Sequence, residues 1–250
     1  MKLYKYMPAD FGLEAIRTRK IKVTTILDAN DPNEWMPVCP DPKNGVEDYH
    51  KNPRYRAQFR YWWATHQGFI SLSAKWDNPV LWGHYADKCR GVALVFEPMN
   101  ANDRKVKEVD YRDDRYVLDE REIYSEDQDK VNRLVARKAR VWEYEKEYRV
   151  LADLHLCETK RIGNNTLYFH PLDNPVIKLT GILLGPESTV TCYDVHNAFK
   201  ENPPLGFTSI QLAFDSPTYG IVESDRKVWN GKDWITQDFE SEESIKGGVA

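Results

Sequence analysis

Apolar and polar residues alternate along several stretches of the chain, and elsewhere apolar residues recur every three or four positions. The first pattern, together with short apolar runs, predicts strands. They cover residues 2–6, 21–26, 69–73, 91–96, 105–111, 142–150, 174–184, 208–214 and 218–222. The second pattern predicts helices. They cover residues 11–19, 79–87 and 190–202 and the second half of 112–141. Because strands and helices follow no regular alternation, we expect an α+β fold rather than a doubly wound sheet.

These elements predict one domain. We expect a single catalytic-type α+β domain over residues 1–239, with split mixed and antiparallel β-sheets and flanking helices, and a flexible tail over residues 240–250. We pair the strand at 105–111 with the one at 91–96. Residues 28–47 are rich in Asp, Asn and Pro and predict a long loop. Loops of this length in compact domains are usually functional or disordered.

Composition narrows the functional classes. The net charge is −4, so global charge does not attract nucleic acid or anionic lipid, and only a local basic patch could. The four cysteines are far apart in the sequence, which disfavours a disulfide framework or a zinc knuckle. No apolar signal segment and no run of 18 apolar residues occurs. We therefore expect a cytoplasmic protein without a membrane partner.

The stretch at residues 142–150, Trp-Glu-Tyr-Glu-Lys-Glu-Tyr-Arg-Val, carries the strongest chemical signal. In a strand, alternation places Glu143, Glu145, Glu147 and Arg149 on one face. Such a row faces either water, as a solvated surface with local ion pairs, or a ligand. Neighbouring carboxylates can also have their pKa values pushed apart, which produces an acid and a base at neutral pH. A helix with Glu143 and Glu147 four positions apart is the structural alternative.

A basic and aromatic segment at residues 53–68 has two interpretations. It forms either an amphipathic helix with buried aromatic residues and solvated arginines, or a surface that stacks single-stranded bases and holds phosphates. A second basic run precedes the Glu-rich stretch and comprises Arg133, Arg137, Lys138 and Arg140. If both runs flank one cleft, a nucleic-acid acceptor becomes credible. The candidate nucleic-acid residues are Arg54, Arg56, Arg60 and Arg137.

Four motifs, in order, resemble a large bacterial domain family of unknown function. They are Leu3-Tyr4-Lys5-Tyr6, the Asn30-Asp31-Pro32 loop, the Leu-Trp-x-His-Tyr-Ala-Asp helix at 81–87 followed by Gly91, and Trp-x-Tyr-Glu-x-Glu-Tyr-Arg at 142–149. The resemblance spans residues 1–220. It implies a shared fold but no activity.

A more distant similarity links the chain to the mono-ADP-ribosyltransferase superfamily. A basic residue on an early strand, a Ser-x-Ser strand and a later Glu-x-Glu are similar to the pattern of that superfamily. The resemblance implies NAD as substrate and Glu147 as the catalytic acid, with Glu145 orienting or deprotonating the acceptor. It further implies an NAD site formed by Lys5, Ser71 or Ser73, with Trp82 and Tyr85 as candidate stacking residues.

Some of these residues have other interpretations. The superfamily usually has Arg or His where this chain has Lys5, and a lysine cannot make the bidentate contact of an arginine with a phosphate. Tyr4 or Tyr6 could take part instead. Ser71 and Ser73 could be ordinary strand serines. Trp82 and Tyr85 could simply pack their helix against the core.

Three hypotheses follow. The first is an NAD-dependent mono-ADP-ribosyltransferase modifying a protein or nucleic acid, which by analogy suggests a toxin or phage-defence effector with a possible antitoxin. The second is a metal-dependent nuclease or hydrolase using Glu145, Glu147 and an aspartate such as Asp31. The third is a non-catalytic nucleic-acid-binding module that uses its aromatic surface.

Overall fold

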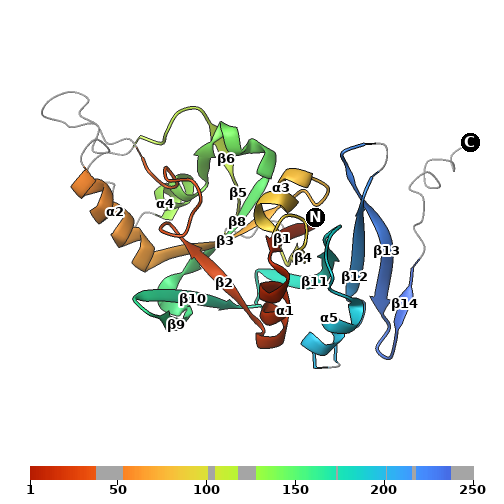
Figure 1. The fold of residues 1–250 in the computed structure, drawn as a ribbon. Helices are drawn as coiled ribbons and strands as arrows, with labels where there is room; N and C mark the ends of the chain where they lie inside the picture. The colour runs from red at the N-terminus through yellow and green to blue at the C-terminus, as the bar shows by residue number, and fades with distance from the viewer. Residues whose placement is uncertain are drawn as a thin grey trace, which may run out of the picture. The chain divides into compact units, whose positions relative to one another are not determined.

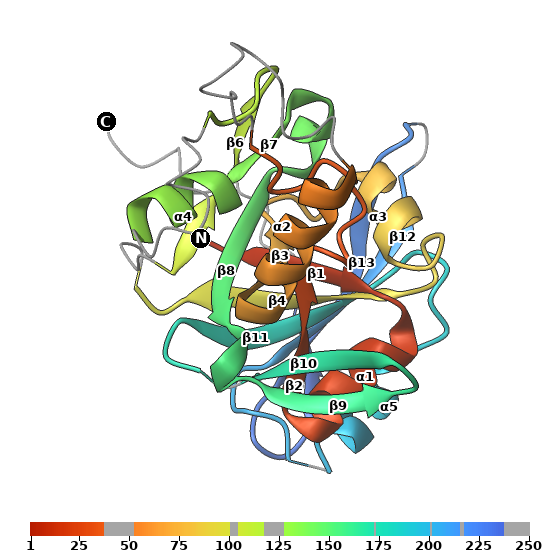
Figure 2. The same cartoon turned by 90° about the vertical axis from the view of Figure 1, so that its left-hand side faces the viewer.

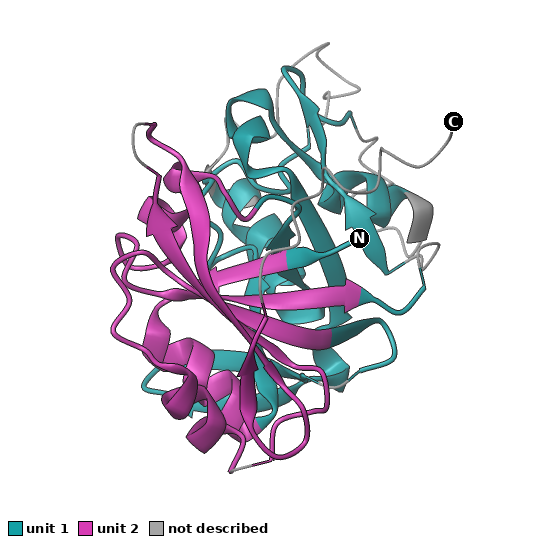
Figure 3. Cartoon of the chain, turned by 90° about the vertical axis from the view of Figure 1, so that its right-hand side faces the viewer, with its two compact units in different colours: residues 1–3, 19–75, 98–178 teal, residues 4–18, 76–97, 179–250 magenta. Residues whose placement is uncertain are grey.

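The computed structural model describes residues 1–37, 53–100, 105–117, 128–172, 174–200, 202–215 and 218–237 (Figure 1). Within these ranges the protein is mixed α/β, with a few helices and with both parallel and antiparallel strand pairs. The chain forms two compact units that interleave along the sequence (Figure 3). Unit 1 comprises residues 1–3, 19–75 and 98–178, and unit 2 comprises residues 4–18, 76–97 and 179–250.

Unit 1 is built on strands in the order β3-β2-β10-β9, with β8 pairing β3 and β5 pairing β8. These strands are β2 (Lys20–Thr25), β3 (Gln67–Ser73), β5 (Val106–Glu108), β8 (Glu147–Asp153), β9 (Glu158–Ile162) and β10 (Asn165–Pro171). The pairs β3–β8, β5–β8, β2–β3, β2–β10 and β9–β10 are all antiparallel. Figure 2 shows the β9–β10 hairpin beside β2.

A second, two-stranded sheet in unit 1 pairs β6 (Asp110–Arg112) in parallel with β7 (Arg137–Ala139). The helices of this unit are α2 (Pro53–His66), α4 (Gln128–Val135) and the 3₁₀ helices η3 (Arg140–Glu145) and η4 (Leu154–Leu156). The short helix η3 connects β7 to β8, and therefore links the small sheet to the central strand pair.

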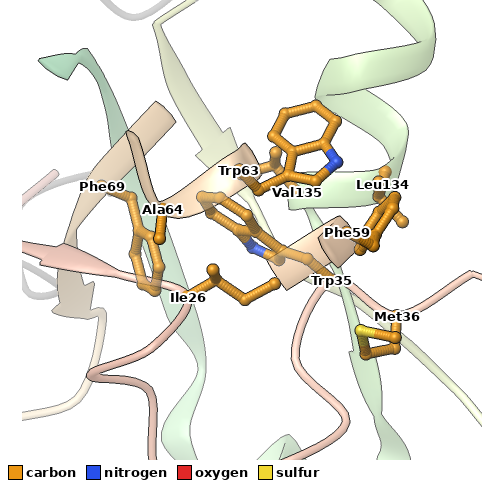
Figure 4. Close-up of a cluster of buried hydrophobic side chains, with 9 residues drawn as sticks. All are labelled: Ile26, Trp35, Met36, Phe59, Trp63, Ala64, Phe69, Leu134 and Val135. Atoms are coloured by element: carbon orange, nitrogen blue, oxygen red, sulfur yellow. The ribbon is translucent and has the colours of Figure 1, made fainter. Parts of the chain in front are cut away.

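The core of unit 1 lies between α2, α4 and the segment that follows β2. Its buried members are Ile26, Trp35, Met36, Phe59, Trp63, Ala64, Phe69, Leu134 and Val135 (Figure 4). Phe59 and Trp63 of α2 are 6% and 3% exposed, while Arg54 on the same helix is exposed. The basic and aromatic segment is therefore an amphipathic helix, the first of its two predicted interpretations.

Unit 2 has the strand order β14-β13-β12-β11-β4-β1. The strands are β1 (Leu3–Met7), β4 (Val92–Pro98), β11 (Ile177–Leu184), β12 (Thr208–Phe214), β13 (Ile221–Trp229) and β14 (Trp234–Thr236). Its helices are α1 (Ala9–Thr18), α3 (Pro79–Tyr85) and α5 (Cys192–Ala198). The Asn78 side chain caps α3 by accepting a hydrogen bond from the backbone N–H of Val80, and Pro79 follows at the first turn.

The structure corrects two predictions about elements and adds one hairpin. The strand at 105–111 does not pair with β4; its first part, β5, pairs with β8. The hairpin of β9 and β10 was not predicted, because its exposed residues follow no burial pattern. The strand expected at 142–150 begins only at Glu147, after η3. Among the described helices, none has the length and apolar content that crossing a membrane requires.

Candidate functional site

The Ser-x-Ser and Glu-x-Glu segments lie side by side in unit 1. In the antiparallel pair β3–β8, Ser73 is opposite Glu147 and Ser71 is opposite Arg149. The Ser73 hydroxyl donates a hydrogen bond of 2.6 Å to the backbone oxygen of Glu145. Ser71 makes a hydrogen bond to the Glu147 carboxylate. These serines therefore hold both glutamates of the motif.

The Glu-rich stretch is not one continuous strand. Lys146 has φ 44° and ψ 54°, a left-handed conformation that ends η3, and its N–H donates to the backbone oxygen of Glu143. This turn removes Glu143 from the predicted row; its carboxylate is half exposed and pairs with Lys146 at 3.2 Å. Glu145 and Glu147 are buried, 5% and 2% exposed. The prediction of a four-residue face is therefore wrong for Glu143 and right in bringing Glu145, Glu147 and Arg149 together.

Five charged side chains form what we call the buried ionic cluster: Glu34, Lys138, Glu145, Glu147 and Arg149. None is more than 9% exposed. Lys138 Nζ lies 2.5 Å from Glu145 Oε2, 3.0 Å from Glu147 Oε2 and 3.9 Å from Glu34 Oε2. The Lys138 ammonium also faces the Trp142 ring, 5.1 Å from its centroid. Lys138 thus bridges all three carboxylates.

Arg149 is fully buried and joins the same carboxylates from the other side. Its Nε lies 2.9 Å from Glu147 Oε1, and its Nη2 lies 2.9 Å from Glu147 Oε2 and 2.7 Å from Glu34 Oε1. Its Nη1 donates to the backbone oxygen of Val135, and its guanidinium lies over the Phe69 ring at 4.6 Å. Every nitrogen of the guanidinium therefore donates to an acceptor, as burial of an arginine requires.

The pKa values of Glu34 and Glu147 move in opposite directions. Burial alone would raise the pKa of Glu147, but the charges of Arg149 and Lys138 outweigh it and hold that pKa at about 2. Burial raises the pKa of Glu34, and its contacts with Arg149 and Lys138 do not offset that effect. A pair of carboxylates separated in this way is the arrangement that supports acid–base chemistry.

The two cations of the cluster remain charged. Burial lowers the pKa of Lys138, but the nearby carboxylates Glu147, Glu34 and Glu145 outweigh it and raise the pKa. The pKa of Arg149 is likewise raised, because Glu147 and Glu34 overcome its burial. Three carboxylates thus face two cations. Buried ion clusters contribute little net stability compared with apolar packing, so a cluster with excess negative charge favours a functional interpretation.

Glu34 is presented by a tightly held segment after β2. Arg60 of α2 donates to the backbone oxygens of Pro32 (2.7 Å) and Ile26 (2.8 Å), and Arg56 donates to that of Pro32 (2.7 Å). Trp35 has φ 54°, an outlier for a bulky residue. The described contacts of Arg56 and Arg60 are therefore with this segment. Their predicted role in nucleic-acid binding stays a prediction.

A cleft of about 240 Å³ lies against the cluster in unit 1. Glu34 and Lys138 are the cluster members that line it. Its charged lining residues are Asp31, Glu34, Arg112, Asp113, Asp114, Arg115, Arg137 and Lys138. The equal numbers of acidic and basic groups suit a ligand that carries both signs of charge.

A second hollow of about 470 Å³, here called the basic hollow, shares Tyr116 and Arg137 with the cleft. It is lined by Lys107, Asp110, Tyr116, Asn132, Arg133, Ala136 and Arg137. Three of these side chains are cationic and one is acidic. Three residues of the predicted basic run therefore line these hollows: Arg133 lines the basic hollow, Lys138 lines the cleft, and Arg137 lines both.

The remaining predicted NAD residues lie in unit 2. Trp82 is fully buried, donates from Nε1 to the backbone oxygen of Trp76 at 2.6 Å, and meets Tyr6 edge-on at 5.0 Å. Trp82 therefore packs α3 against the core, which is the alternative to stacking on NAD. Tyr4 is 9% exposed, and its burial, followed by the charge of Glu223, raises the pKa of its phenol to about 12. Strand alternation places Lys5 on the opposite face of β1 from Tyr4.

Tyr85 ends α3 and is partly buried, edge-on to His84 at 5.9 Å. The structure therefore brings Ser71, Ser73, Glu145 and Glu147 together in unit 1. Tyr4, Lys5, Trp82 and Tyr85 belong to unit 2.

The residues of the metal-site hypothesis make other contacts in the structure. Among the described residues, no group of three or more His, Cys, Asp or Glu side chains is placed to hold a metal ion. Lys138 Nζ lies among the carboxylates of the cluster, and Asp31 accepts a hydrogen bond from the backbone N–H of Asn33 at 2.8 Å. The carboxylates of the cluster therefore form ion pairs with Lys138, and Asp31 stabilises a turn.

Sequence reasoning missed three members of the site. Glu34 lies in the predicted long loop, two residues after the Asn-Asp-Pro motif, and Lys138 lies in the basic run. Tyr111 accepts a 2.7 Å hydrogen bond at its hydroxyl from the backbone N–H of Glu147. The sequence did contain one signal for Glu34, because this acidic residue stands next to Trp35 and two residues after the Asn-Asp-Pro motif.

Comparison with known proteins gives one result. A family model matches residues 81–150, and its family is described as a protein of unknown function, DUF2971. The match includes the helix motif at 81–87 and the Glu-rich stretch, as the resemblance to a family of unknown function predicted, and it covers less than a third of the chain. Searches of curated proteins and of solved structures found no significant match.

Proposed function

We propose that the protein transfers ADP-ribose from NAD, with the chemistry centred on the cleft and the buried ionic cluster of unit 1. One observation carries this proposal: Glu34 and Glu147 share the guanidinium of Arg149, while their pKa values are displaced in opposite directions. Acid–base roles are commonly divided between such a pair of carboxylates.

The chemistry uses a carboxylate that stays ionised and a carboxylate that can accept a proton. The bond between nicotinamide and C1′ of the ribose breaks, and its electron pair leaves with nicotinamide. The sugar then carries an oxocarbenium-like positive charge, which nearby negative charge stabilises. An acceptor nucleophile forms a new bond to C1′ and gives its proton to a base. A base works best when its pKa lies near the working pH.

In this proposal the roles are divided between two carboxylates. Glu34 lines the cleft and has the raised pKa, so in this proposal it accepts the proton of the acceptor. Glu147 is 2% exposed, stays ionised and pairs with Arg149 and Lys138, so in this proposal it is a positioning residue that fixes these two cations beside Glu34. Glu145 holds Lys138 in place at 2.5 Å. The proposal therefore keeps Glu147 essential and adds Glu34 as the residue nearest the substrate.

The Ser-x-Ser and Glu-x-Glu pairing supports the same proposal, because the ADP-ribosyltransferase resemblance implies that these segments share one site. The acceptor, a protein or a nucleic acid, belongs to the proposal as well. So do the toxin or phage-defence role and an antitoxin partner, which rest on analogy.

The test is transfer of label from ³²P-NAD to cell extract by the full chain. We expect Glu34→Gln and Glu147→Gln each to lower labelling by at least about 100-fold, the usual contribution of a catalytic acid or base. Glu143→Gln is the matched control, because Glu143 is half exposed and outside the cluster. Circular dichroism establishes that each variant is folded. No labelling by the wild type with any extract, or equal labelling by all four proteins, would refute the proposal.

A further inference from the structure

The basic hollow carries positive charge that the described protein groups leave uncompensated. Its acidic residue, Asp110, already binds two arginines: Oδ1 lies 2.8 Å from Arg112 Nε and Oδ2 lies 3.2 Å from Arg137 Nη2. The side chains of Lys107 and Arg133 make no hydrogen bond or ion pair with any residue in the described ranges. Two cations that line one hollow and have no partner within the described part of the chain indicate an anionic ligand.

A flat platform lies beside these cations. The Arg137 guanidinium lies over the Tyr116 ring, 5.5 Å from its centroid. Arg137 Nε is buried and has no hydrogen-bond partner among the described residues. Guanidinium and aromatic planes are the surfaces on which nucleobases stack. The lining of the hollow thus combines phosphate-binding groups with a surface suited to a base.

The position of the hollow connects it to the chemistry. The cleft and the basic hollow share Tyr116 and Arg137, so a ligand occupying both would pass these two residues. NAD has two unlike halves, an anionic nucleoside diphosphate and a cationic nicotinamide riboside. The basic hollow matches the first half. The cleft matches the second, because Glu34 lines it and belongs to a cluster with one more carboxylate than cations.

We infer that the basic hollow binds a nucleoside diphosphate, which in NAD is the ADP half, with the phosphates on Lys107 and Arg133 and the base against Tyr116. This inference rests on the proposed function for the identity of the ligand. The hollow has about 470 Å³, within the range of about 300–1,000 Å³ usual for small-molecule sites.

Calorimetric titration of ADP into the full chain tests the inference without requiring catalysis. We expect ADP to bind and Lys107→Gln, Arg133→Gln and Tyr116→Ala each to weaken binding by about tenfold, since a charge-assisted hydrogen bond or a stacked base contributes about this factor. Arg161→Gln, at an exposed arginine of β9 in the same unit, is the matched control and should bind as the wild type does.

The comparison ligands distinguish the outcomes. Absence of ADP binding, or equal binding by all variants, would overturn the inference, and so would pyrophosphate binding as tightly as ADP, since the base would then contribute nothing. Tighter, variant-sensitive binding of a single-stranded oligonucleotide would assign the hollow to a nucleic-acid strand instead. ADP binding without any NAD labelling would refute the transferase proposal but would still support the basic hollow as a nucleoside diphosphate site. NAD labelling that is unchanged by Arg133→Gln would refute the assignment of the basic hollow and leave the transferase proposal standing.

Discussion

Glu34 and Glu147 bind the same nitrogen of one arginine: Arg149 Nη2 lies 2.7 Å from Glu34 Oε1 and 2.9 Å from Glu147 Oε2. Glu147 also binds Arg149 Nε and Lys138, whereas Lys138 is 3.9 Å from Glu34. Glu147 is therefore the better compensated carboxylate. This difference explains why the pKa of Glu147 is lowered and that of Glu34 is raised by burial.

Removal of the shared guanidinium should be strongly destabilising. Arg149→Met leaves Glu34 and Glu147 buried without it, and breaking a buried ion pair from one side costs about 3–5 kcal/mol. Urea unfolding measures this change in the free energy of unfolding. Lys146→Met is the control, because Lys146 pairs with Glu143 at the surface, and such pairs contribute about 0–1 kcal/mol. Equal effects of the two substitutions would show that the buried pairing is not what stabilises this region.

Acid should weaken the fold through Glu147. Its pKa is about 2 in the folded protein and 4.5 ordinarily, so the folded state binds the proton less readily than the unfolded state. The stabilisation is therefore present above pH 4.5 and is lost as the pH falls towards 2. Urea unfolding between pH 2 and 7 should show a smaller acid-induced loss for Glu147→Gln than for the wild type. Glu143→Gln should follow the wild type; a loss shared equally by all three proteins would contradict the assignment.

Glu34 should act in the opposite direction. Its pKa is raised in the folded protein, so its contribution to stability is present below the unfolded pKa and is lost as the pH rises through the folded pKa. Glu34→Gln should therefore become more stable relative to the wild type as the pH rises from 4 to 8. The same urea titrations measure this difference. A relative stability that stays constant over that range would mean that Glu34 is not perturbed.

Two glycines within the region matched by the family model should respond oppositely to alanine. A Cβ on Gly91 would lie 2.3 Å from the backbone oxygen of Met7 and 2.8 Å from the backbone of Ala86, so Gly91→Ala should destabilise unit 2 or prevent its folding. A Cβ on Gly83, within α3, would meet nothing within 4 Å. Gly83→Ala should therefore stabilise the protein by up to about 1 kcal/mol through helix propensity. Thermal unfolding monitored by circular dichroism compares the two variants.

The sequence predicted only part of the site, because some of the contacts in the site join residues that are far apart along the chain. Ser71, Ser73 and Glu147 belong to two strands whose alternation is visible locally, and Glu145 lies just before the second of these strands. The order of the motifs predicts that these residues lie close together. The contact of Glu34 with Arg149 joins segments that are distant in sequence and share no periodic pattern. The left-handed turn at Lys146 also escaped prediction, because a non-glycine residue gives no local sign of positive φ.

The fold shows the same division between local and long-range information. The amphipathic helix α2 and the capped helix α3 follow from apolar spacing and from Asn78-Pro79. The pairing of β5 with β8 depends on the path of the chain between distant strands, so adjacency in sequence wrongly suggested β4 as its partner. The hairpin β9–β10 is mostly exposed and therefore lacks the burial pattern from which strands are predicted.

Glu34 and Glu147 are a pair of carboxylates whose pKa values are displaced in opposite directions, and a ¹³C NMR titration of the glutamate side-chain carboxyls measures this displacement directly. The Glu34 and Glu147 resonances are assigned with the two Gln variants. We expect Glu147 to remain ionised down to pH 4 and below, and the midpoint of Glu34 to lie above the ordinary value of 4.5. Titration of both carboxyls together near the ordinary glutamate value of about 4.3 would contradict it.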